Sequence, residues 1–258
     1  MGALVECRLK QKGVYYPHLT PLSKVFIYVY FIEVVMISSF KAVCFDMDGT
    51  LMNTDVDYIK MSDLVFDEMV RAGVPEAMID RKGGNKFNID SGVKFLVGQG
   101  RQNELYEIEK RIASRARDIE MENSDLARPF PGAIRLLTEL RKKGYRTGVL
   151  TRGCREYAEK ILTQNHIIEL LDGLVCRDDF PEKDAKPSPV AMQNLAKAVK
   201  CNTKDIVYVG DHGMDYKCAV SAGSGFIGVL SGGYDRNDWK NLGDVDVVNT
   251  IADILEML

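Results

Sequence analysis

Residues 41–50, Lys-Ala-Val-Cys-Phe-Asp-Met-Asp-Gly-Thr, decide which fold we expect for this chain. The first five residues are mostly apolar, β-branched or aromatic, which is typical of a short buried strand. Asp46 and Asp48 follow the end of this strand, at the edge where open α/β sheets gather their ligands. Two carboxylates placed there can hold a divalent cation, attack an electrophile or move a proton. A plain Asp-Gly turn is the simplest alternative.

The composition is that of an ordinary globular protein. The 258 residues suffice for one large domain or for a core with an insertion. A net charge of −3 argues against a nucleic-acid partner. The six cysteines are scattered and form no C-x-x-C pair, which favours reduced thiols over a disulfide framework. We therefore expect a cytoplasmic protein.

The N-terminal segment differs from the rest of the chain. Residues 25–37 are almost continuously apolar, with Glu33 as the one charged residue. This run is shorter than the roughly 20 residues of a membrane helix, and its Tyr, Phe, Val and Ile content favours a strand. We expect no stable membrane insertion and treat residues 1–37 as an extension outside the catalytic fold. Met36 is well placed to be the working initiator, downstream of an earlier start codon.

Helical patterns replace the strand pattern after Thr54. Residues 59–70 and 105–119 carry apolar side chains at helical spacing, and no strand pattern occurs between about residues 55 and 125. We predict that residues 55–128 form an all-helical insertion. A polar loop at residues 83–86, Gly-Gly-Asn-Lys, is the part of it expected to face the active site, with a simple helix connector as the alternative.

Strands and helices alternate from residue 129 onward, as expected for a parallel sheet built from strand–helix–strand units. The predicted strands are 145–150, 174–176, 206–209, 226–230 and 245–248, and the predicted helices are 133–140, 154–162 and one that Pro189 opens. Residues 38–54 and 129–258 are therefore predicted to form one α/β core.

Three of the predicted strands end in residues with useful chemistry. Asp46 and Asp48 follow the first strand, Thr151 follows the strand at 145–150, and Asp211 follows the strand at 206–209. Lys186 lies in a Lys-Pro-Ser-Pro loop that leads into a helix. All strands of a parallel sheet end at the same edge, so these side chains can converge although they are distant in sequence.

These motifs resemble those of haloacid dehalogenase-superfamily phosphatases that carry a helical cap inserted after the first motif, as phosphoglycolate phosphatases do. The matching elements are Asp46-Met-Asp48-Gly49-Thr50, Thr151, Lys186 before Pro187, and Gly210-Asp211-His-Gly-Met-Asp215. The resemblance runs from about residue 40 to the C-terminus, and the cap matches only in placement and helical character. It implies a Rossmann-like sheet with helices on both faces, and Mg²⁺-dependent hydrolysis of a small phosphorylated metabolite through an aspartyl-phosphate intermediate.

The resemblance also implies a role for each acid. Asp46 would be the nucleophile that accepts the phosphoryl group, and Asp48 the general acid that protonates the leaving oxygen and later helps to activate water. Mg²⁺ would bind Asp46, the backbone carbonyl of Asp48 and Asp211. Asp215 would support this site through water or Lys186. For Asp211 and Asp215, a helix N-cap is the structural alternative.

The remaining candidates would contact the phosphate. Thr151 and the amides that follow it, Gly153 included, would cradle phosphate oxygens, and Lys186 would neutralise phosphate and nucleophile. A helix cap and a surface lysine are the simpler alternatives. Arg152 stands where many relatives carry asparagine, and it could bind an anionic substrate group in bidentate fashion or pair with an acid of the cap. We prefer the ion pair. His212 lies between two of the candidate acids, but a lone histidine is weak evidence for a ligand.

Two other functions stay open at this point. A sugar-phosphate mutase shares all four motifs and differs in how the cap excludes water, and a catalytically silent regulatory protein would keep the fold without turnover. Asp48 argues against dehalogenase-type members, which lack an acid there, and against ion-pump-type members, which have lysine. The substrate depends on the cap and not on the fold, and the resemblance favours phosphoglycolate. The sequence indicates no oligomeric state.

Overall fold

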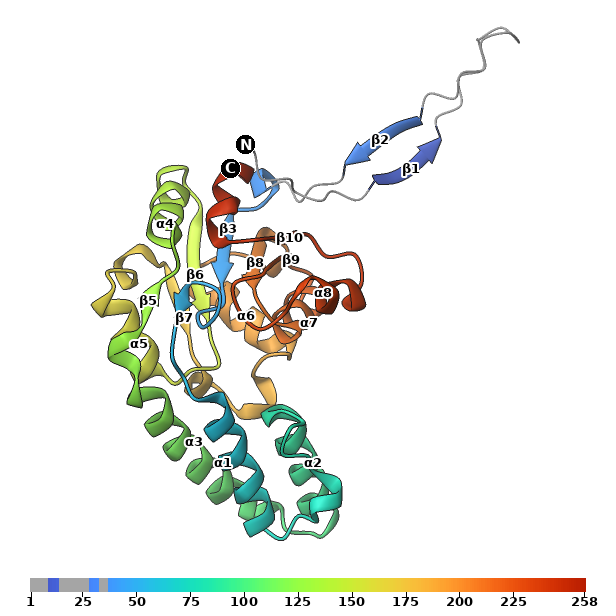
Figure 1. Ribbon diagram of the computed structural model, residues 1–258, viewed down its shortest axis with the longest axis vertical. Coiled ribbons are helices and arrows are strands. Elements are labelled where there is room, and N and C mark those ends of the chain that lie inside the picture. The colour runs from blue at the N-terminus through green and yellow to red at the C-terminus, as the bar shows by residue number, and fades with distance from the viewer. Residues whose placement is uncertain (1–8, 14–27, 33–36) are drawn as a thin grey trace, which may run out of the picture.

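The computed structural model describes residues 9–13, 28–32 and 37–258 (Figure 1). Its largest sheet has six parallel strands in the order β10-β9-β8-β3-β6-β7. The strands are β3 (Ala42–Phe45), β6 (Arg146–Leu150), β7 (Gly173–Val175), β8 (Ile206–Gly210), β9 (Gly225–Val229) and β10 (Val247–Val248). The strand predicted at residues 41–45 is thus β3, and it lies in the interior of the sheet between β6 and β8.

Helices cover both faces of this sheet, because both faces are apolar. Val43 and Phe45 pack against α4, α5 and the C-terminal 3-10 helix, whereas Ala42 and Cys44 pack on the side of α6, α7 and α8. The helices are α4 (Ala133–Lys142), α5 (Arg155–Gln164), α6 (Pro189–Ala198), α7 (Gly213–Ser221), α8 (Arg236–Leu242) and the 3-10 helix Ile251–Met257. A parallel sheet covered in this way has near-continuous apolar strands. The predicted α/β fold is confirmed.

Two parts of the core depart from the prediction. The last strand, predicted at 245–248, contains only Val247–Val248, which pair with Gly228 and Val229 of β9, and residues 245 and 246 lie outside the strand. The short helix α8 was not predicted. It has Asp235 as its N-cap, and Trp239 is its one buried residue, so it shows no apolar periodicity.

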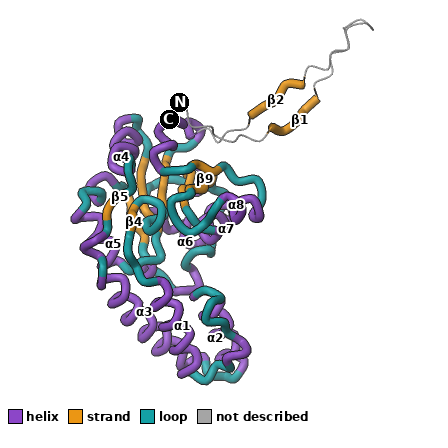
Figure 2. The backbone as a smooth tube through the Cα atoms, in the orientation of Figure 1, coloured by secondary structure: helices purple, strands orange, loops and turns teal. Residues whose placement is uncertain are grey.

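The helical segment, residues 58–122, lies between the two short strands β4 (Met52–Asn53) and β5 (Arg128–Pro129). These strands pair antiparallel where the chain leaves and re-enters the core, as Figure 2 shows. The segment contains α1 (Tyr58–Arg71), α2 (Asn85–Gly98) and α3 (Leu105–Glu122), and α1 packs against both other helices. Figure 1 shows it as a lobe beyond the carboxyl edge of the sheet, toward which β3 points.

The loop predicted at residues 83–86 is only partly a loop, because α2 already begins at Asn85 after Gly84, whose φ is 80°. Gly92 and Ser91 are weak helix formers, so the sequence pattern of α2 was inconspicuous. Gly92 is needed for packing, since a Cβ atom there would lie 2.2 Å from the Met69 sulfur.

The described N-terminal residues form a separate two-stranded antiparallel sheet of β1 (Leu9–Gly13) and β2 (Tyr28–Ile32). The predicted strand character of residues 25–37 is therefore confirmed where β2 is described. Met36 lies outside the described residues, and its role as initiator stays a prediction. In the described part of the chain, no helix combines the length and the apolar character needed to cross a membrane.

A buried carboxylate stabilises the helical segment. Glu68 of α1 is fully buried and forms ion pairs with Arg111 and Arg115 of α3, each at 3.0 Å, and with Arg71 at 3.2 Å. The arginines are about half exposed, so water screens part of each interaction. The carboxylate itself depends on them, because an unpaired buried charge is costly.

We predict that Glu68→Gln lowers the free energy of unfolding by about 2 kcal/mol, because the amide fits the same space but carries no charge for the three arginines. Urea denaturation followed by circular dichroism measures this. Glu107→Gln, at an exposed position in the first turn of α3, is the matched control and should change stability by less than about 0.5 kcal/mol. Equal unfolding midpoints for both variants would contradict the prediction.

Candidate active site

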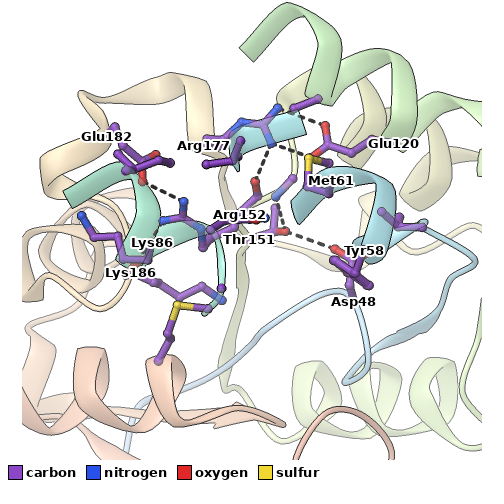
Figure 3. Close-up of a pocket in the computed structure, with 18 of the residues that line it drawn as sticks. Asp48, Tyr58, Met61, Lys86, Glu120, Thr151, Arg152, Arg177, Glu182 and Lys186 are labelled. Atoms are coloured by element: carbon purple, nitrogen blue, oxygen red, sulfur yellow. Dashed lines mark hydrogen bonds and ion pairs between the residues drawn. The ribbon is translucent and has the colours of Figure 1, made fainter. Parts of the chain in front are cut away.

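One cavity of about 1100 Å³ lies between the carboxyl edge of the sheet and the helical segment. Every site residue predicted from the sequence lines it: Asp46, Asp48, Thr151, Arg152, Gly153, Lys186, Asp211 and Asp215. Figure 3 shows several of these side chains together with residues of the helical segment. The structure therefore brings together the groups that the motifs placed at separate strand ends.

The turn after β3 places the two acids of the first motif. The Asp46 N–H donates to the Val209 carbonyl at 2.8 Å, which continues the sheet pairing beyond β3. The chain then turns through Gly49, whose φ of +82° favours glycine. A Cβ atom at this position would also lie 2.6 Å from the Asp211 carboxylate. Gly49 therefore allows both the turn and the close approach of Asp211.

Lys186 provides the positive charge among the acids. Its side chain is only 4% exposed, and its ammonium group donates to the carboxylate of Asp46, to Asp215 Oδ1 at 2.7 Å and to the Tyr208 hydroxyl at 3.2 Å. Burial alone would lower the pKa of Lys186, but the two carboxylates outweigh it and raise that pKa. Lys186 is therefore held as a cation, and the surface-lysine alternative is wrong.

Three carboxylates could hold a metal ion. One oxygen each of Asp46, Asp211 and Asp215 lies within 4.8 Å of the others, and all three residues are buried. The Asp211 carboxylate accepts hydrogen bonds from Thr50 Oγ1 at 3.1 Å and from the Gly233 N–H at 2.6 Å. A Cβ atom on Gly232 would lie 2.0 Å from Asp211 Oδ2, so the absence of a side chain there makes room for the carboxylate. Hard oxygen donors of this kind suit Mg²⁺.

Asp48 has a different environment from Asp46. Its carboxylate accepts hydrogen bonds from the Tyr157 hydroxyl at 2.7 Å and from Thr54 Oγ1 at 2.8 Å, and Thr151 Oγ1 lies 3.5 Å away. Desolvation raises the pKa of Asp48, although the first two hydrogen bonds oppose the shift. A raised pKa suits a proton donor. The sequence did not reveal Tyr157 or Thr54, because neither belongs to a motif.

Thr151 and Gly153 form a compact turn after β6. The Gly153 N–H donates to Thr151 Oγ1 at 2.9 Å, which fixes the hydroxyl at the cavity wall. Cys154, and not Thr151, is the N-cap of α5, so the helix-cap alternative for Thr151 is wrong. Their contact with phosphate stays a prediction.

The expected ion pair of Arg152 is present, but its partner lies in the core and not in the helical segment. One guanidinium nitrogen is 2.7 Å from Glu182, which lies in the 3-10 turn Glu182–Asp184, and the other donates to the Lys186 carbonyl at 3.0 Å. Arg152 thus connects the Thr151 turn to the loop that carries Lys186. The sequence analysis did not predict that Glu182 is the partner of Arg152, because the two loops are distant in sequence and only the folded sheet brings them together.

A different ion pair joins the helical segment to the core at the cavity wall. Glu120 of α3 is 5% exposed and forms a bidentate pair with Arg177 at 2.6 and 3.1 Å. The same carboxylate accepts from the Cys154 N–H at 3.3 Å, and Arg177 donates to the Arg152 carbonyl at 3.2 Å. The sequence analysis did not predict Glu120 or Arg177 as site residues, because neither belongs to a motif and the chain has many other charged residues.

The start of α7 shows that the N-cap alternative is wrong for Asp211, whereas Asp215 takes part in capping as the third residue of the helix. His212 is the N-cap residue, with its Nδ1 accepting from the Met214 N–H at 3.2 Å. Asp211 therefore does not cap this helix. Asp215 has two partners, because its Oδ2 accepts from the His212 N–H at 3.1 Å while its Oδ1 faces Lys186. The His212 imidazole acts here in local structure.

The fold and these motifs define a class of hydrolase. Residues 43–229 match the family described as haloacid dehalogenase-like hydrolase. The chain belongs to this family and is an enzyme of the haloacid dehalogenase-like type.

Curated relatives of the chain are phosphatases. It is 25% identical over 227 residues to a phosphoglycolate phosphatase of Vibrio vulnificus, covering 84% of this chain and 96% of that protein. It is 28% identical over 211 residues to an N-acetylmuramic acid 6-phosphate phosphatase of Pseudomonas putida, covering 81% of this chain and 91% of that protein.

Solved structures share the fold. A hydrolase from Pseudomonas syringae has a TM-score of 0.58 at 21% identity, covering 83% of this chain and 96% of that chain. A haloacid dehalogenase-like family hydrolase from Streptococcus pneumoniae has a TM-score of 0.56 at 19% identity, covering 85% of this chain and 98% of that chain.

The central position of Lys186 predicts an effect on stability. Lys186→Met should lower the free energy of unfolding by about 3 kcal/mol in buffer that contains a chelator, because Asp46 and Asp215 would lose their shared cation. Lys183→Met, which changes an exposed lysine of the same loop, is the control and should leave the urea midpoint unchanged. A Lys186→Met protein as stable as the control would show that the ammonium does not stabilise the acid cluster.

Proposed function

We propose that the protein is an Mg²⁺-dependent phosphomonoester hydrolase that acts on a small phosphorylated metabolite through an aspartyl-phosphate intermediate. The observation that carries this proposal is the contact of the buried Lys186 ammonium with both Asp46 and Asp215. It keeps a carboxylate and a cation at the same point of the cavity, where a phosphoryl group can be bound and attacked.

In the first step, a carboxylate oxygen of Asp46 attacks phosphorus while the bond from phosphorus to the leaving oxygen breaks. The Asp48 carboxyl gives its proton to the leaving oxygen, so that an alcohol departs. The raised pKa of Asp48 supports this assignment, because the acid must carry its proton before the step. The Tyr157 and Thr54 hydroxyls orient the Asp48 carboxyl.

In the second step, water attacks the phosphorus of the aspartyl phosphate. The ionised Asp48 accepts a proton from this water, and the bond between phosphorus and the Asp46 oxygen breaks. Inorganic phosphate and the Asp46 carboxylate result. Thr151 and Gly153 line the cavity with Lys186, and we assign the Thr151 hydroxyl, oriented by the Gly153 N–H, to the phosphoryl oxygens in both steps.

The acid cluster supports the Mg²⁺ part of the proposal. Asp46, Asp211 and Asp215 supply the oxygen donors, and the Asp48 backbone carbonyl is the further ligand that the resemblance implies. When bound, Mg²⁺ would neutralise charge on the transferred phosphoryl group. We assign Asp215 to the cluster as well as to Lys186, because its carboxylate lies close to both groups.

We further propose that residues 55–128 act as a cap over a catalytic core of residues 38–54 and 129–258. The cavity between the two parts supports this division, since Lys86 and Glu120 of the helical segment face Thr151 and Lys186 of the core. The five described cysteines are free thiols, which supports a cytoplasmic location. The names of the curated relatives make phosphoglycolate the first substrate to test.

The test is phosphate release from p-nitrophenyl phosphate and from a panel of phosphorylated metabolites, with and without Mg²⁺. Asp46→Asn should lower turnover by about a thousandfold or more, because an amide cannot form the acyl phosphate. The matched control Asp118→Asn changes an exposed carboxylate of α3 and should retain activity. Wild-type-like turnover of Asp46→Asn would refute the proposed nucleophile, and an isomerised phosphate ester as the main product would favour the mutase.

A further inference from the structure

Three consecutive residues of the turn after β6 are bonded through their backbone to Glu120 and Arg177. The Arg177 side chain donates to the Arg152 carbonyl at 3.2 Å, and the Arg177 backbone N–H donates to the Gly153 carbonyl at 3.0 Å. The Cys154 N–H donates to the Glu120 carboxylate at 3.3 Å. These two residues therefore fix the path of the turn.

The turn in its own structure orients the hydroxyl that we assign to phosphate. The Gly153 N–H donates to Thr151 Oγ1 at 2.9 Å, while the carbonyl of the same glycine accepts from Arg177. A displacement of Gly153 would therefore move the Thr151 hydroxyl as well. The position of Arg177 is thus transmitted to the cavity wall through one residue.

Glu120 and Arg177 also hold each other in place. Both oxygens of the carboxylate are bonded to the guanidinium, at 2.6 and 3.1 Å, and the side chains are 5% and 16% exposed. Figure 3 shows Arg177 beside Glu120 at the cavity wall. Charge-assisted bidentate pairs of this kind are strong and geometrically specific. The turn is therefore bonded to a pair whose own geometry is fixed.

The pair connects the turn to the helical segment, because Glu120 belongs to α3 and Arg177 belongs to the core. Arg117 of α3 and Glu156 of α5 form another pair between the same two parts, at 2.6 and 2.9 Å. Those side chains are about half exposed, and neither lines the cavity. Of these two pairs, only that of Glu120 contacts the turn.

The charges of the pair balance each other where phosphate would bind. Glu120 and Arg177 line the cavity together with Thr151. If Arg177 were removed, a buried and unpaired carboxylate would remain at the cavity wall and would repel a phosphoryl group. Arg177 thus has two effects, since it holds the turn and neutralises Glu120.

We propose that Glu120 and Arg177 are positioning residues for phosphoryl transfer. They hold the turn after β6, and with it the Thr151 hydroxyl, in the conformation that binds phosphoryl oxygens, and they make this conformation depend on the packing of α3. The inference rests on the proposed function, which supplies the phosphoryl ligand. Both residues act through the turn, and a small displacement of a group that binds the transition state lowers the rate strongly.

Titration calorimetry with inorganic phosphate and Mg²⁺ tests this inference without turnover. Glu120→Gln keeps the size of the side chain but puts an amide nitrogen where an oxygen accepts a hydrogen bond. We expect Kd to rise at least about tenfold in Glu120→Gln, and further in Arg177→Met, which leaves the carboxylate unpaired. The matched control Glu156→Gln breaks the exposed pair and should stay within about twofold of the wild type. A wild-type Kd in either of the first two variants would overturn the inference.

Hydrolysis of p-nitrophenyl phosphate separates positioning from folding. We expect kcat to fall at least about tenfold in Glu120→Gln. The double variant Glu120→Gln/Arg177→Met should lose no more than Arg177→Met alone, because the pair acts as a unit. Additive losses, or folded variants in which only the urea midpoint changes, would overturn the inference.

Hydrogen–deuterium exchange of the turn measures its conformation directly. The Cys154 amide should exchange at least about tenfold faster in Glu120→Gln than in the wild type, because its acceptor is weakened. Glu156→Gln should show the wild-type rate, and equal rates in both variants would overturn the inference. The proposed function fails separately, by the absence of Mg²⁺-dependent phosphate release from every ester tested with the wild-type enzyme.

Discussion

The contact of one buried cation with two buried carboxylates is the interaction on which the site depends. Lys186 reaches Asp46 at the end of β3 and Asp215 in the first turn of α7, and thereby connects three loops that the sheet alone only brings near one another. Its own loop is fixed by Arg152, which donates to the Lys186 carbonyl and pairs with Glu182. Removing water from three acids is costly without such a cation. The chain thus concentrates negative charge where a phosphoryl group and a metal ion could bind.

The sequence predicted which residues converge at the carboxyl edge of the sheet, because each of these motifs can be recognised from a few neighbouring residues. A strand followed by acids at β3, a strand followed by Thr151 and a strand followed by Asp211 are each visible in a few residues, and a parallel sheet brings their ends together without further information. The supporting contacts were not predictable in this way. Tyr157 reaches Asp48 from a helix more than a hundred residues away, and only the folded structure shows which face of that helix meets the site.

The predictions for α2 and for the last strand were wrong for a similar reason, because both elements depend on contacts with distant parts of the chain. Helix α2 contains Gly92, which a propensity argument counts against a helix, whereas the Met69 side chain requires it. The last strand contains only Val247–Val248, and its length is set by the pairing with β9, which residues 245–248 alone do not show. The shape of the cavity could not be predicted from the sequence either, since it depends on how α1, α2 and α3 are spaced.

The most direct test of the central claim is to locate the phosphoryl group during turnover. Asp48→Asn should still allow attack by Asp46 on an ester with a good leaving group, but it lacks the base for the second step, so the intermediate should accumulate. Rapid acid quenching of this variant with p-nitrophenyl phosphate and Mg²⁺, followed by peptide mass spectrometry, should show a hydroxylamine-sensitive phosphoryl group on Asp46. A phosphoryl group on another residue, or turnover without any phosphorylated enzyme, would contradict the assignment of Asp46 as the nucleophile.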